Sequence, residues 1–600
     1  MKRFLAPLLI ALVTFGVYAP VVRDGFVWDD TALILRDPFI RSWRLIPEGF
    51  QHFLFTDATA SDFFRPIQRL TYTLDYAAFG FRPAGYHLAS VAWHAAAAVA
   101  LFFFATELLR SLGLVGWRLR GIATATSLAW AIHPLQTAAV AYISGRADAL
   151  AALFGFAGLY CGLRVLRSDR RQRWILYLAT GFLFLLSALS KEVGLINLVL
   201  WLVIFAAQKQ WKAFRAAALV SIFVLVVYAT LRAQAEHVPT PPKPPVPALV
   251  RPILVARDFA EYTGLVIFPL SLHMDRDVET RAAGSSEASM VAASWRELET
   301  LAGILLIAAF VYWLVRERRR GPAVFLLLLL TLVSYLPISG VVALNATIAE
   351  HWLYLPSAFL LIAVALTFLR WLESLENRPM LRGSLVVAFG IWFVFLGART
   401  FARTFDWKDQ RTFLERTISS GGNSARMLIN MAGLELSEGR LDAAKQHLNE
   451  ALRKQPEQPL AIVNLAAVAV KQNDFPAAHE LLKRAVQMPL VEAQADELLA
   501  VLESKETGHA NVMRMHLAAR SGPVNWSIEK RYVMLLDETG ATDAGIHELQ
   551  AILVNEWYRA DSWKLLSELL AKSGRLADAE EALAKARAYD VHCDETPVRP

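Results

Sequence analysis

The chain has 600 residues, of which 55% are hydrophobic and only 19% are charged, and the apolar surplus lies before residue 400. This composition excludes a fully soluble protein and predicts a polytopic membrane protein with a soluble tail. A net charge of +7 could suggest a nucleic-acid partner. We interpret it instead as an orientation signal, with no nucleic acid bound, because the arginines gather in short loops between apolar runs.

About eleven apolar runs are long enough to cross a membrane as helices. The first follows Lys2 and Arg3 and resembles a signal peptide, but no cleavage site is convincing, so we expect an uncleaved first span. The predicted spans are residues 4–22, 86–109, 121–139, 147–165, 174–189, 193–207, 213–231, 298–315, 322–338, 352–369 and 383–398.

The arginine-rich loops put the N-terminus in the cytoplasm if every one of these runs crosses. The first long loop, residues 23–85, follows one span and then lies on the outer side. Because the number of spans is odd, everything after residue 398 lies on that side too. That side is extracytoplasmic, the periplasm of a bacterium or the lumen of a eukaryotic compartment. The second long outer loop, residues 232–297, contains a proline-rich stretch at 239–247, which predicts an extended spacer.

The segment 251–270 in that second loop is apolar but carries Arg257, Asp258 and Glu261. If it crossed the membrane, the arginine cluster at 316–320 would lie outside, against the charge rule. We therefore expect an interfacial or re-entrant helix on the outer face.

Two adjacent carboxylates, Asp29 and Asp30, follow the first apolar run in the stretch FVWDD. Like charges resist joint ionisation, which raises the pKa of one of them. The pair therefore predicts an acid/base site at the outer edge of the membrane. The alternative is that one aspartate caps a short helix at 31–35 or only solvates the loop.

The first outer loop, residues 23–85, interleaves aromatic residues with arginines, among them Arg65 and Arg69. This pattern predicts an amphipathic segment at the bilayer surface, either an interfacial anchor or a platform for substrate. Both alternatives put the loop beside lipid headgroups.

Polar residues also recur at the outer ends of the spans, where ionisable groups normally face a protein cavity or pair with one another. Together they predict a polar outer chamber at the depth of the Asp pair. The alternative is a set of structural pairs, such as Arg146 with Asp148 or Lys191 with Glu192. The residues are His87, His94, His133, Arg146, Asp148, Lys191, Glu192, Glu350 and His351.

The tail after residue 400 has the 34-residue period of tetratricopeptide repeats. We expect a linker at 401–423 and about five repeats at 424–593, and solenoids of this kind bind peptide segments on a concave face. The alanines that carry the period are Ala432, Ala444 and Ala451, then Ala466, Ala478 and Ala485. Turns are expected at Gly439, Asn473, Gly508, Gly540 and Gly574.

Several motifs resemble, in order, the transmembrane-and-TPR-repeat O-mannosyltransferase family of the GT-C superfamily. They are FVWDD, FRPIQRLTYTLDYAAFG, YHLASVAWH, AWAIHPLQTAAVAYISGRADALAALF, LSKE and EHWLYLPS, followed by the repeats. The resemblance covers nearly the whole chain. It implies an all-α fold, with a GT-C-like helical membrane domain at 1–400 and a TPR solenoid after it. It also implies a membrane glycosyltransferase that uses a polyprenyl-phosphate-linked sugar.

Within this family the acidic pair of the first outer loop lies at the reaction centre, which corresponds to Asp29 and Asp30. Arg65, His133 and Arg146 match further motif positions. The chain departs from the pattern at His351 and Trp352, where the family has a pair led by a basic residue, and this leaves the role of Glu350 open.

Sugar transfer from a lipid phosphate needs a base for the acceptor hydroxyl and cations for the phosphate leaving group. Asp29 is the better candidate for the base, with Asp30 positioning it or a cation. We leave open a divalent metal on the Asp pair. The cations expected at the phosphate are Arg65, Arg146 and Lys191, and the further donor or substrate contacts are His87, His133, Asp148, Glu192 and Glu350.

The sequence supports two classes of function. The first is a glycosyltransferase that moves a sugar such as mannose to a hydroxyl, with the repeats recruiting a protein acceptor and the spans contacting lipid. The second is a membrane scaffold, or a lipid or glycan transporter, in which the Asp pair only organises a cavity. Convergence of the acidic pair and the arginines on one cavity open to lipid favours the first.

Overall fold

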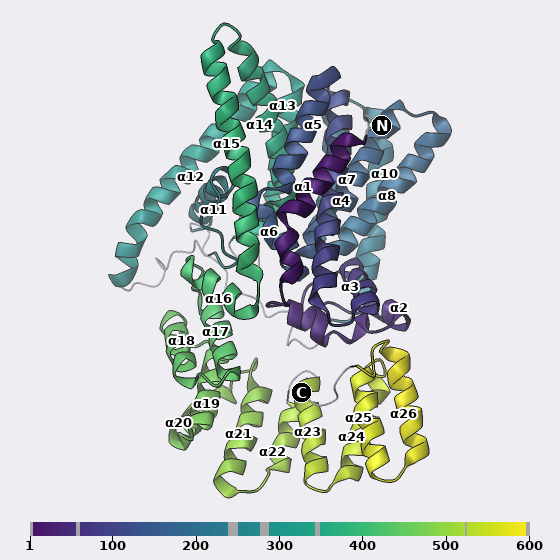
Figure 1. Cartoon of the computed structure of the whole chain (residues 1–600), viewed down its shortest axis with the longest axis vertical. Helices are drawn as coiled ribbons and strands as arrows, with labels where there is room; N and C mark the ends of the chain where they lie inside the picture. The colour runs from purple at the N-terminus through teal and green to yellow at the C-terminus, as the bar shows by residue number, and fades with distance from the viewer. Residues whose placement is uncertain are drawn as a thin grey trace.

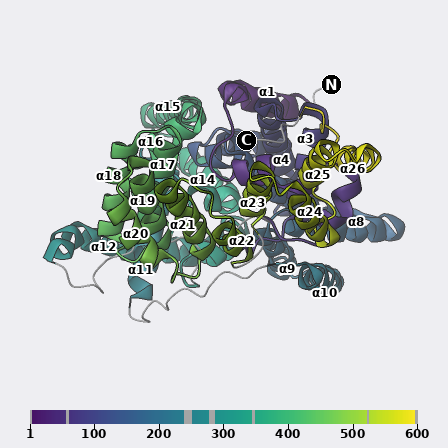
Figure 2. The same ribbon diagram turned by 90° about the horizontal axis from the view of Figure 1, so that it is seen from below.

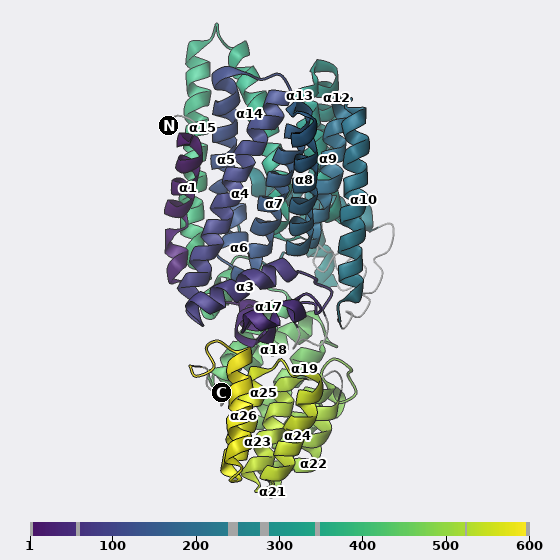
Figure 3. The same ribbon diagram turned by 90° about the vertical axis from the view of Figure 1, so that its right-hand side faces the viewer.

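The computed structural model describes residues 4–55, 61–237, 250–276, 287–342, 348–521 and 525–595, without the side chains of 287–296. Throughout these residues the regular structure is helical and no strand is formed, which confirms the predicted all-α fold. Figure 3 shows a bundle of long helices and, below it, a solenoid of shorter ones. The proline-rich spacer predicted at 239–247 lies outside the described residues.

Each of the predicted spans overlaps a helix of the bundle. Among the described residues, seven helical stretches are long and apolar enough to cross a membrane, and α1, α9 and α13 belong to shorter apolar helices. The chain is therefore a multi-pass membrane protein, and the count of eleven spans stays a prediction. The helices are α1 (Leu5–Val17), α4 (Pro83–Ser111), α5 (Gly116–Ala131), α7 (Arg146–Arg164), α8 (Arg170–Ser190), α9 (Ile196–Ala207), α10 (Trp211–Gln234), α12 (Glu287–Arg320), α13 (Pro322–Tyr335), α14 (Tyr354–Ser374) and α15 (Pro379–Thr404).

The core of the bundle lies where α4, α5, α7 and α14 meet, around Trp130. Its indole N–H donates to the Tyr354 carbonyl at 2.8 Å, and its ring lies 5.8 Å from that of Phe156. Glycines let α7 approach its neighbours closely, since a Cβ on Gly158 would meet Phe184 at 2.5 Å. This rigid packing fixes the outer ends of α7 and α14, from which site residues project.

The span predicted at 121–139 is wrong in its second half. α5 ends at Ala131, before Pro134, because proline lacks an amide hydrogen and restricts the residue that precedes it. The chain then forms three short helices, η5 (Pro134–Gln136), α6 (Thr137–Val140) and η6 (Ile143–Gly145), all of them buried. We call residues 134–145 the buried segment.

The first outer loop is a folded layer of short helices. Its alternating arginines and aromatics pack together: buried Arg69 donates to Asp37 and to the carbonyls of Gly49, His52 and Phe53. The prediction of a simple amphipathic segment is therefore incomplete, because the charge is satisfied inside the protein. The helices are η1 (Ala19–Arg23), η2 (Thr31–Arg36), η3 (Pro38–Ile40), η4 (Trp43–Leu45), α2 (Ile46–Gly49) and α3 (Pro66–Phe79).

The helix expected at 251–270 is present as α11 (Arg251–Ile267), which packs against α12. Its charges are buried: Arg257 donates to Thr300 at 2.8 Å and to Glu297 at 3.0 Å. The charged residues that argued against a span thus have protein partners, and an interfacial position for α11 stays a prediction.

Among the described residues, the tail forms five helix pairs. Gly439, Asn473, Gly508, Gly540 and Gly574 all have positive φ and lie between the two helices of a pair. The repeating alanines, such as Ala432 and Ala466, are fully buried. The pairs are α17 (Ala425–Ser437) with α18 (Leu441–Lys454), α19 (Pro459–Gln472) with α20 (Phe475–Ala485), α21 (Glu492–Thr507) with α22 (Val512–Arg520), α23 (Trp526–Glu538) with α24 (Thr542–Asn555), and α25 (Ala560–Lys572) with α26 (Leu576–Tyr589).

The segment 401–423, expected to be a linker, is helical and packed. α15 continues to Thr404, and η12 (Phe405–Trp407) and α16 (Gln410–Ser419) follow. Trp407 and Phe413 are buried in one apolar cluster with Val27 of the first outer loop and Met427 of the first repeat. The boundary between the two parts is therefore a shared core.

The other end of the solenoid returns to the first outer loop, as Figures 1 and 2 show for α25, α26 and the region of α2 and α3. The buried Tyr76 hydroxyl donates to Asp590 at 2.8 Å, and the Ser42 hydroxyl donates to the Ala588 carbonyl at 3.0 Å. We call these bonds the C-terminal contact. The solenoid thus meets the bundle at both of its ends.

Replacing Tyr76 by Phe removes a buried hydrogen bond to a carboxylate, which is worth about 1.5–3 kcal/mol. We expect the amide hydrogens of α26 to exchange with solvent about tenfold faster or more, because the last repeat then opens locally at lower cost. Hydrogen exchange measured by mass spectrometry checks this, with Tyr589→Phe at the same end of the solenoid as the control. Equal exchange in Tyr76→Phe and wild type would contradict the C-terminal contact.

Candidate active site

Asp30 is fully buried and both of its oxygens accept hydrogen bonds. Oδ1 accepts from the Ser144 amide at 2.8 Å and the Ser144 hydroxyl at 2.7 Å, and Oδ2 accepts from the Val27 amide at 3.2 Å. Burial raises the pKa of Asp30 to about 7, although these bonds lower it. Its side chain makes no capping bond to η2, so the helix-cap alternative is wrong for Asp30.

Asp29 is half-buried and keeps one side open. Its amide donates to the Tyr142 hydroxyl at 3.3 Å. Burial raises the pKa of the Asp29 carboxyl, while hydrogen bonding to Tyr142 and the charges of Arg426 and Arg65 lower it. A carboxyl with a raised pKa that still meets solvent is a candidate general base.

Two ion pairs lie where α3 and α7 begin and α8 ends, and they differ from the structural pairs considered as an alternative. Arg65 donates through Nε to Glu192 at 3.0 Å, and Lys191 donates to both oxygens of Asp148 at 2.7 and 2.8 Å. Lys191 does not pair with Glu192 because Lys191 has extended backbone after α8, and successive side chains of an extended segment diverge. The expected pairs Arg146 with Asp148 and Lys191 with Glu192 are therefore wrong.

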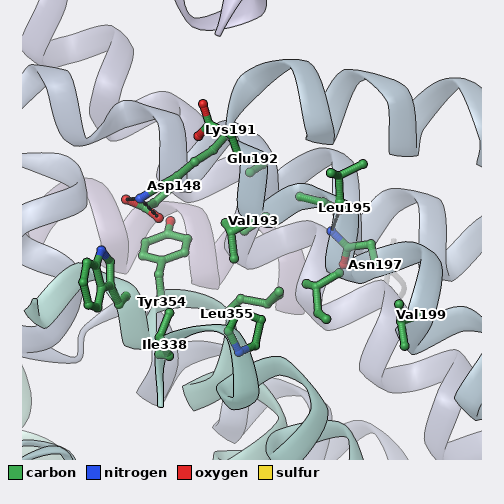
Figure 4. Close-up of a pocket in the computed structure, with 16 residues that line it drawn as sticks. Asp148, Lys191, Glu192, Val193, Leu195, Asn197, Val199, Ile338, Tyr354 and Leu355 are labelled. Carbon is green, nitrogen blue, oxygen red and sulfur yellow. Dashed lines mark hydrogen bonds and ion pairs between the residues drawn. The ribbon is translucent and has the colours of Figure 1, made fainter. Parts of the chain in front are cut away.

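A cavity of about 440 Å³ opens beside these ion pairs. Figure 4 shows Lys191 reaching toward Asp148 at its polar end. The remaining lining is mainly apolar and includes Val199, a residue that is 45% exposed. The apolar lining includes Ala151, Ala152, Val193, Leu195, Ile196, Pro337, Ile338, Trp352, Tyr354 and Leu355.

Arg65 connects the Asp pair to this cavity. It lies close enough to Asp29 to lower the pKa of that carboxyl, and its partner Glu192 lines the cavity. His351 lies within electrostatic reach of both Lys191 and Arg65. Lys191 lines the cavity, Arg65 is joined to it through Glu192, and Asp29 and Asp30 do not line it, so the expected convergence is direct for Lys191 and indirect for Arg65 and the acids.

Three other predicted site residues are buried and act as structural ties. Arg146 donates to Asp75, Ser90, Thr71 and the Tyr86 carbonyl, which fixes the start of α7 to α3 and α4. It does not line the cavity.

His87 contacts the Gly25 carbonyl through Nε2 at 3.2 Å and so holds the loop before the Asp pair. His133 contacts the Val266 carbonyl through Nε2 at 3.0 Å, and its Nδ1 accepts from the Leu135 amide. His94 contacts the Tyr354 hydroxyl at 2.6 Å within the core.

Glu350 is buried away from the cavity, at the junction of the second outer loop with α15. It accepts from the His273 amide and lies 3.6 Å from both Arg276 and Arg403. This geometry favours a role in joining the two outer segments.

Among the described residues no three His, Cys, Asp or Glu side chains come together as metal ligands. The Asp pair offers two carboxylates, and the oxygens of the Asp30 carboxylate already accept three hydrogen bonds from the protein.

The sequence reasoning missed four residues that contact the Asp29 loop. Tyr142 and Ser144 lie in the motif AYISGRAD, where they could have been noticed. Gln410 and Arg426 lie beyond the last span, in α16 and α17, and no local motif marks them.

Comparisons with known proteins agree with this architecture. A family model described as tetratricopeptide repeat matches residues 435–502. Protein O-mannosyl-transferase F38B6.6 of Caenorhabditis elegans is 24% identical over 464 residues, which is 75% of this chain and 63% of that protein. Protein O-mannosyl-transferase TMTC3 of Mus musculus is 22% identical over 624 residues, with 97% of this chain and 63% of that protein covered.

A solved structure, described as YrrB, a TPR protein with an unusual peptide-binding site, covers 30% of this chain and 98% of its own. Its sequence identity is 18% and its TM-score 0.20.

Fold and site together define a multi-pass membrane protein with a cluster of charged residues beside an apolar cavity and a tetratricopeptide solenoid. The chain is related to the proteins named protein O-mannosyl-transferases, which confirms the resemblance of the motifs. It spans about 63% of the length of these two relatives.

Lys191→Met tests the buried ion pair, because it leaves the Asp148 carboxylate without its cation. We expect a loss of about 3–5 kcal/mol in stability, since an uncompensated buried charge is strongly destabilising. The double variant Lys191→Met with Asp148→Leu should recover most of it. Thermal unfolding in detergent measures the effect, and Glu192→Gln at the more exposed pair is the control. If the stability of Lys191→Met equals that of the wild type, the ion pair contributes nothing to folding.

Proposed function

We propose that the chain transfers a hexose, with mannose the first candidate, from a polyprenyl-phosphate-linked donor to a hydroxyl of a protein. The reaction takes place at the outer face of the membrane, with the N-terminus in the cytoplasm. The observation that carries the proposal is the half-buried Asp29, connected through Arg65 to a cavity that is charged at one end and apolar along the rest. The names of the relatives support the class of reaction.

Asp29 acts as the general base. Burial raises the pKa of its carboxyl, so the carboxylate takes a proton more readily than an ordinary aspartate does. Asp30 is unsuited to this role because Ser144 and Val27 occupy its oxygens. It fixes the loop instead.

Arg65 and Lys191 bind the phosphate of the donor. Arg65 uses Nε for Glu192, and among the described residues its two terminal nitrogens have no hydrogen-bond partner, so they are free for a phosphate. Asp148 holds Lys191 in place. The polyprenyl chain occupies the apolar part of the cavity and leaves the bundle past Val199.

The reaction is a single displacement at the anomeric carbon. The acceptor oxygen forms a bond to that carbon as the bond to the phosphate oxygen breaks, and the configuration inverts. The hydroxyl proton goes to Asp29, and the electron pair leaves with the polyprenyl phosphate. Arg65 and Lys191 stabilise the charge that grows on the phosphate.

The solenoid recruits the protein acceptor. Its five pairs offer an extended surface of the kind that binds peptide segments, and its first repeat lies against the Asp29 loop. An acceptor held there is presented close to the base.

Asp29→Asn removes the base with little change of shape, and we expect it to slow transfer about 10²- to 10⁴-fold. The measurement is incorporation of labelled mannose from polyprenyl-phosphate mannose into protein, in membranes that contain the full-length chain. Asp24→Asn, a neutralised carboxyl in the same loop, is the control and should retain transfer. Normal transfer by Asp29→Asn would favour the scaffold or transporter alternative.

The rate should fall as the pH drops through the pKa of Asp29, because the base works only when deprotonated. Since burial raises this pKa above 3.8, the acid limb of the pH–rate profile lies above that of an ordinary aspartate. Tyr142→Phe removes a hydrogen bond that lowers the pKa, so it should move the acid limb to higher pH. A limb that stays in place would argue against Asp29 as the titrating group.

A further inference from the structure

The loop that carries the Asp pair is held from the side of the tail. The Trp28 amide donates to the Gln410 side-chain oxygen at 2.6 Å, and the Gly25 amide donates to the Lys408 carbonyl at 2.8 Å. The Trp28 ring lies 6.2 Å from the ring of Tyr142 in the buried segment and 5.4 Å from the ring of Phe413 in α16. Residues after the last predicted span therefore form one wall of the site.

Trp28 has a left-handed backbone, with φ of 50°. A bulky residue in this region costs about 1–3 kcal/mol, so the conformation persists only if the surroundings impose it. Gln410 contributes by accepting a hydrogen bond from the Trp28 amide, and the rings of Tyr142 and Phe413 pack against the Trp28 side chain. The strain is next to Asp29, and releasing it would displace the proposed base.

Arg426, on the first helix of the solenoid, completes the wall. Its guanidinium lies 5.2 Å from the centre of the Trp28 ring and donates to Asp275 of the second outer loop at 2.8 Å. Asp275 also accepts from the Ser424 amide at 3.2 Å, which docks the start of α17. The charge of Arg426 reaches Asp29 and lowers the pKa of its carboxyl.

We infer that Gln410 and Arg426 are positioning residues for Asp29, so that α16 and the first tetratricopeptide repeat are part of the catalytic machinery. This inference rests on the proposed function and deepens it. It assigns the first repeat a second role besides recruitment, because Asp29 has its working geometry only when that repeat is seated.

The test uses the full-length protein in membranes, with Gln410→Ala, Arg426→Met and the conservative Arg426→Lys. Arg453→Met, which removes an exposed arginine from α18, is the matched control. We expect Gln410→Ala and Arg426→Met to lower kcat about 10- to 100-fold, since a small misplacement of a reacting group has effects of this size. The KM for polyprenyl-phosphate mannose should stay unchanged, because the phosphate contacts are elsewhere.

The two variants should differ in their pH–rate profiles. Arg426→Met removes a charge that favours the carboxylate, so its acid limb should move to higher pH, and Arg426→Lys should restore both the limb and most of kcat. Gln410→Ala should lower kcat without moving the limb. A purely structural role would lower the amount of folded protein and leave kcat and the limb of the remaining enzyme as in wild type.

A second readout does not depend on transfer. A hydrophobic carbodiimide labels protonated carboxyls, so the pH dependence of Asp29 labelling, followed by mass spectrometry, should shift to higher pH in Arg426→Met and not in Arg453→Met. Unchanged labelling in Arg426→Met, together with unchanged kcat in Arg426→Met and Gln410→Ala, would overturn the inference. Absence of transfer by the wild type, with labelling shifted as expected, would instead count against the proposed function.

Discussion

The site depends on the hydrogen bonds that Asp30 accepts inside the protein. They come from its own loop, through Val27, and from the buried segment, through the amide and hydroxyl of Ser144. Hydrogen bonds to a charged group contribute about 1.5–3 kcal/mol each, and breaking them would leave a carboxylate buried without partners. Asp30 is thereby fixed, and the residue before it, Asp29, stays at the edge of the packed layer, where it can meet a substrate.

Burial separates the arginines near the Asp pair into those whose donors are all used within the protein and those with donors left over. Arg146 and Arg69 are fully surrounded, and their guanidinium groups are committed to carboxylates and carbonyls. A ligand could reach them only by breaking those bonds. Arg65 is different because, among the described residues, one of its nitrogens is committed, to Glu192, which lines the cavity. Under the proposed function, the number of hydrogen bonds that each arginine already makes separates the structural arginines from Arg65, which binds the phosphate.

The sequence predicts those features that depend on local pattern. Apolar length predicts the helices of the bundle, and the period of 34 predicts five helix pairs with their turns, since each repeat buries the same small residues. Pro134 predicts a break in the helix, but the apolar residues on both sides of it make residues 121–139 look like one continuous span.

Ion-pair partners could not be predicted, because they depend on tertiary packing. Arg146 finds Asp75, which is 71 residues away, and Arg65 finds Glu192, 127 residues away. The contacts of Trp28 with Gln410 and Arg426 join segments almost 400 residues apart, and no spacing rule connects them. The Asp pair itself was recognisable because two adjacent carboxylates at the end of an apolar run are unusual in composition alone.

The two contacts of the solenoid with the first outer loop have a thermodynamic consequence for the proposed reaction. One contact, through Arg426 of α17, lies at Trp28, and the other, through Tyr76 and Asp590, holds the far side of the same loop. A solenoid tied at both ends cannot change its curvature without straining one of them. An acceptor that binds more tightly to the seated solenoid therefore stabilises the seated loop by the same free energy, because linkage is reciprocal. Under this scheme binding of the acceptor and positioning of Asp29 are one equilibrium, and the base is in place when there is a hydroxyl for it to deprotonate.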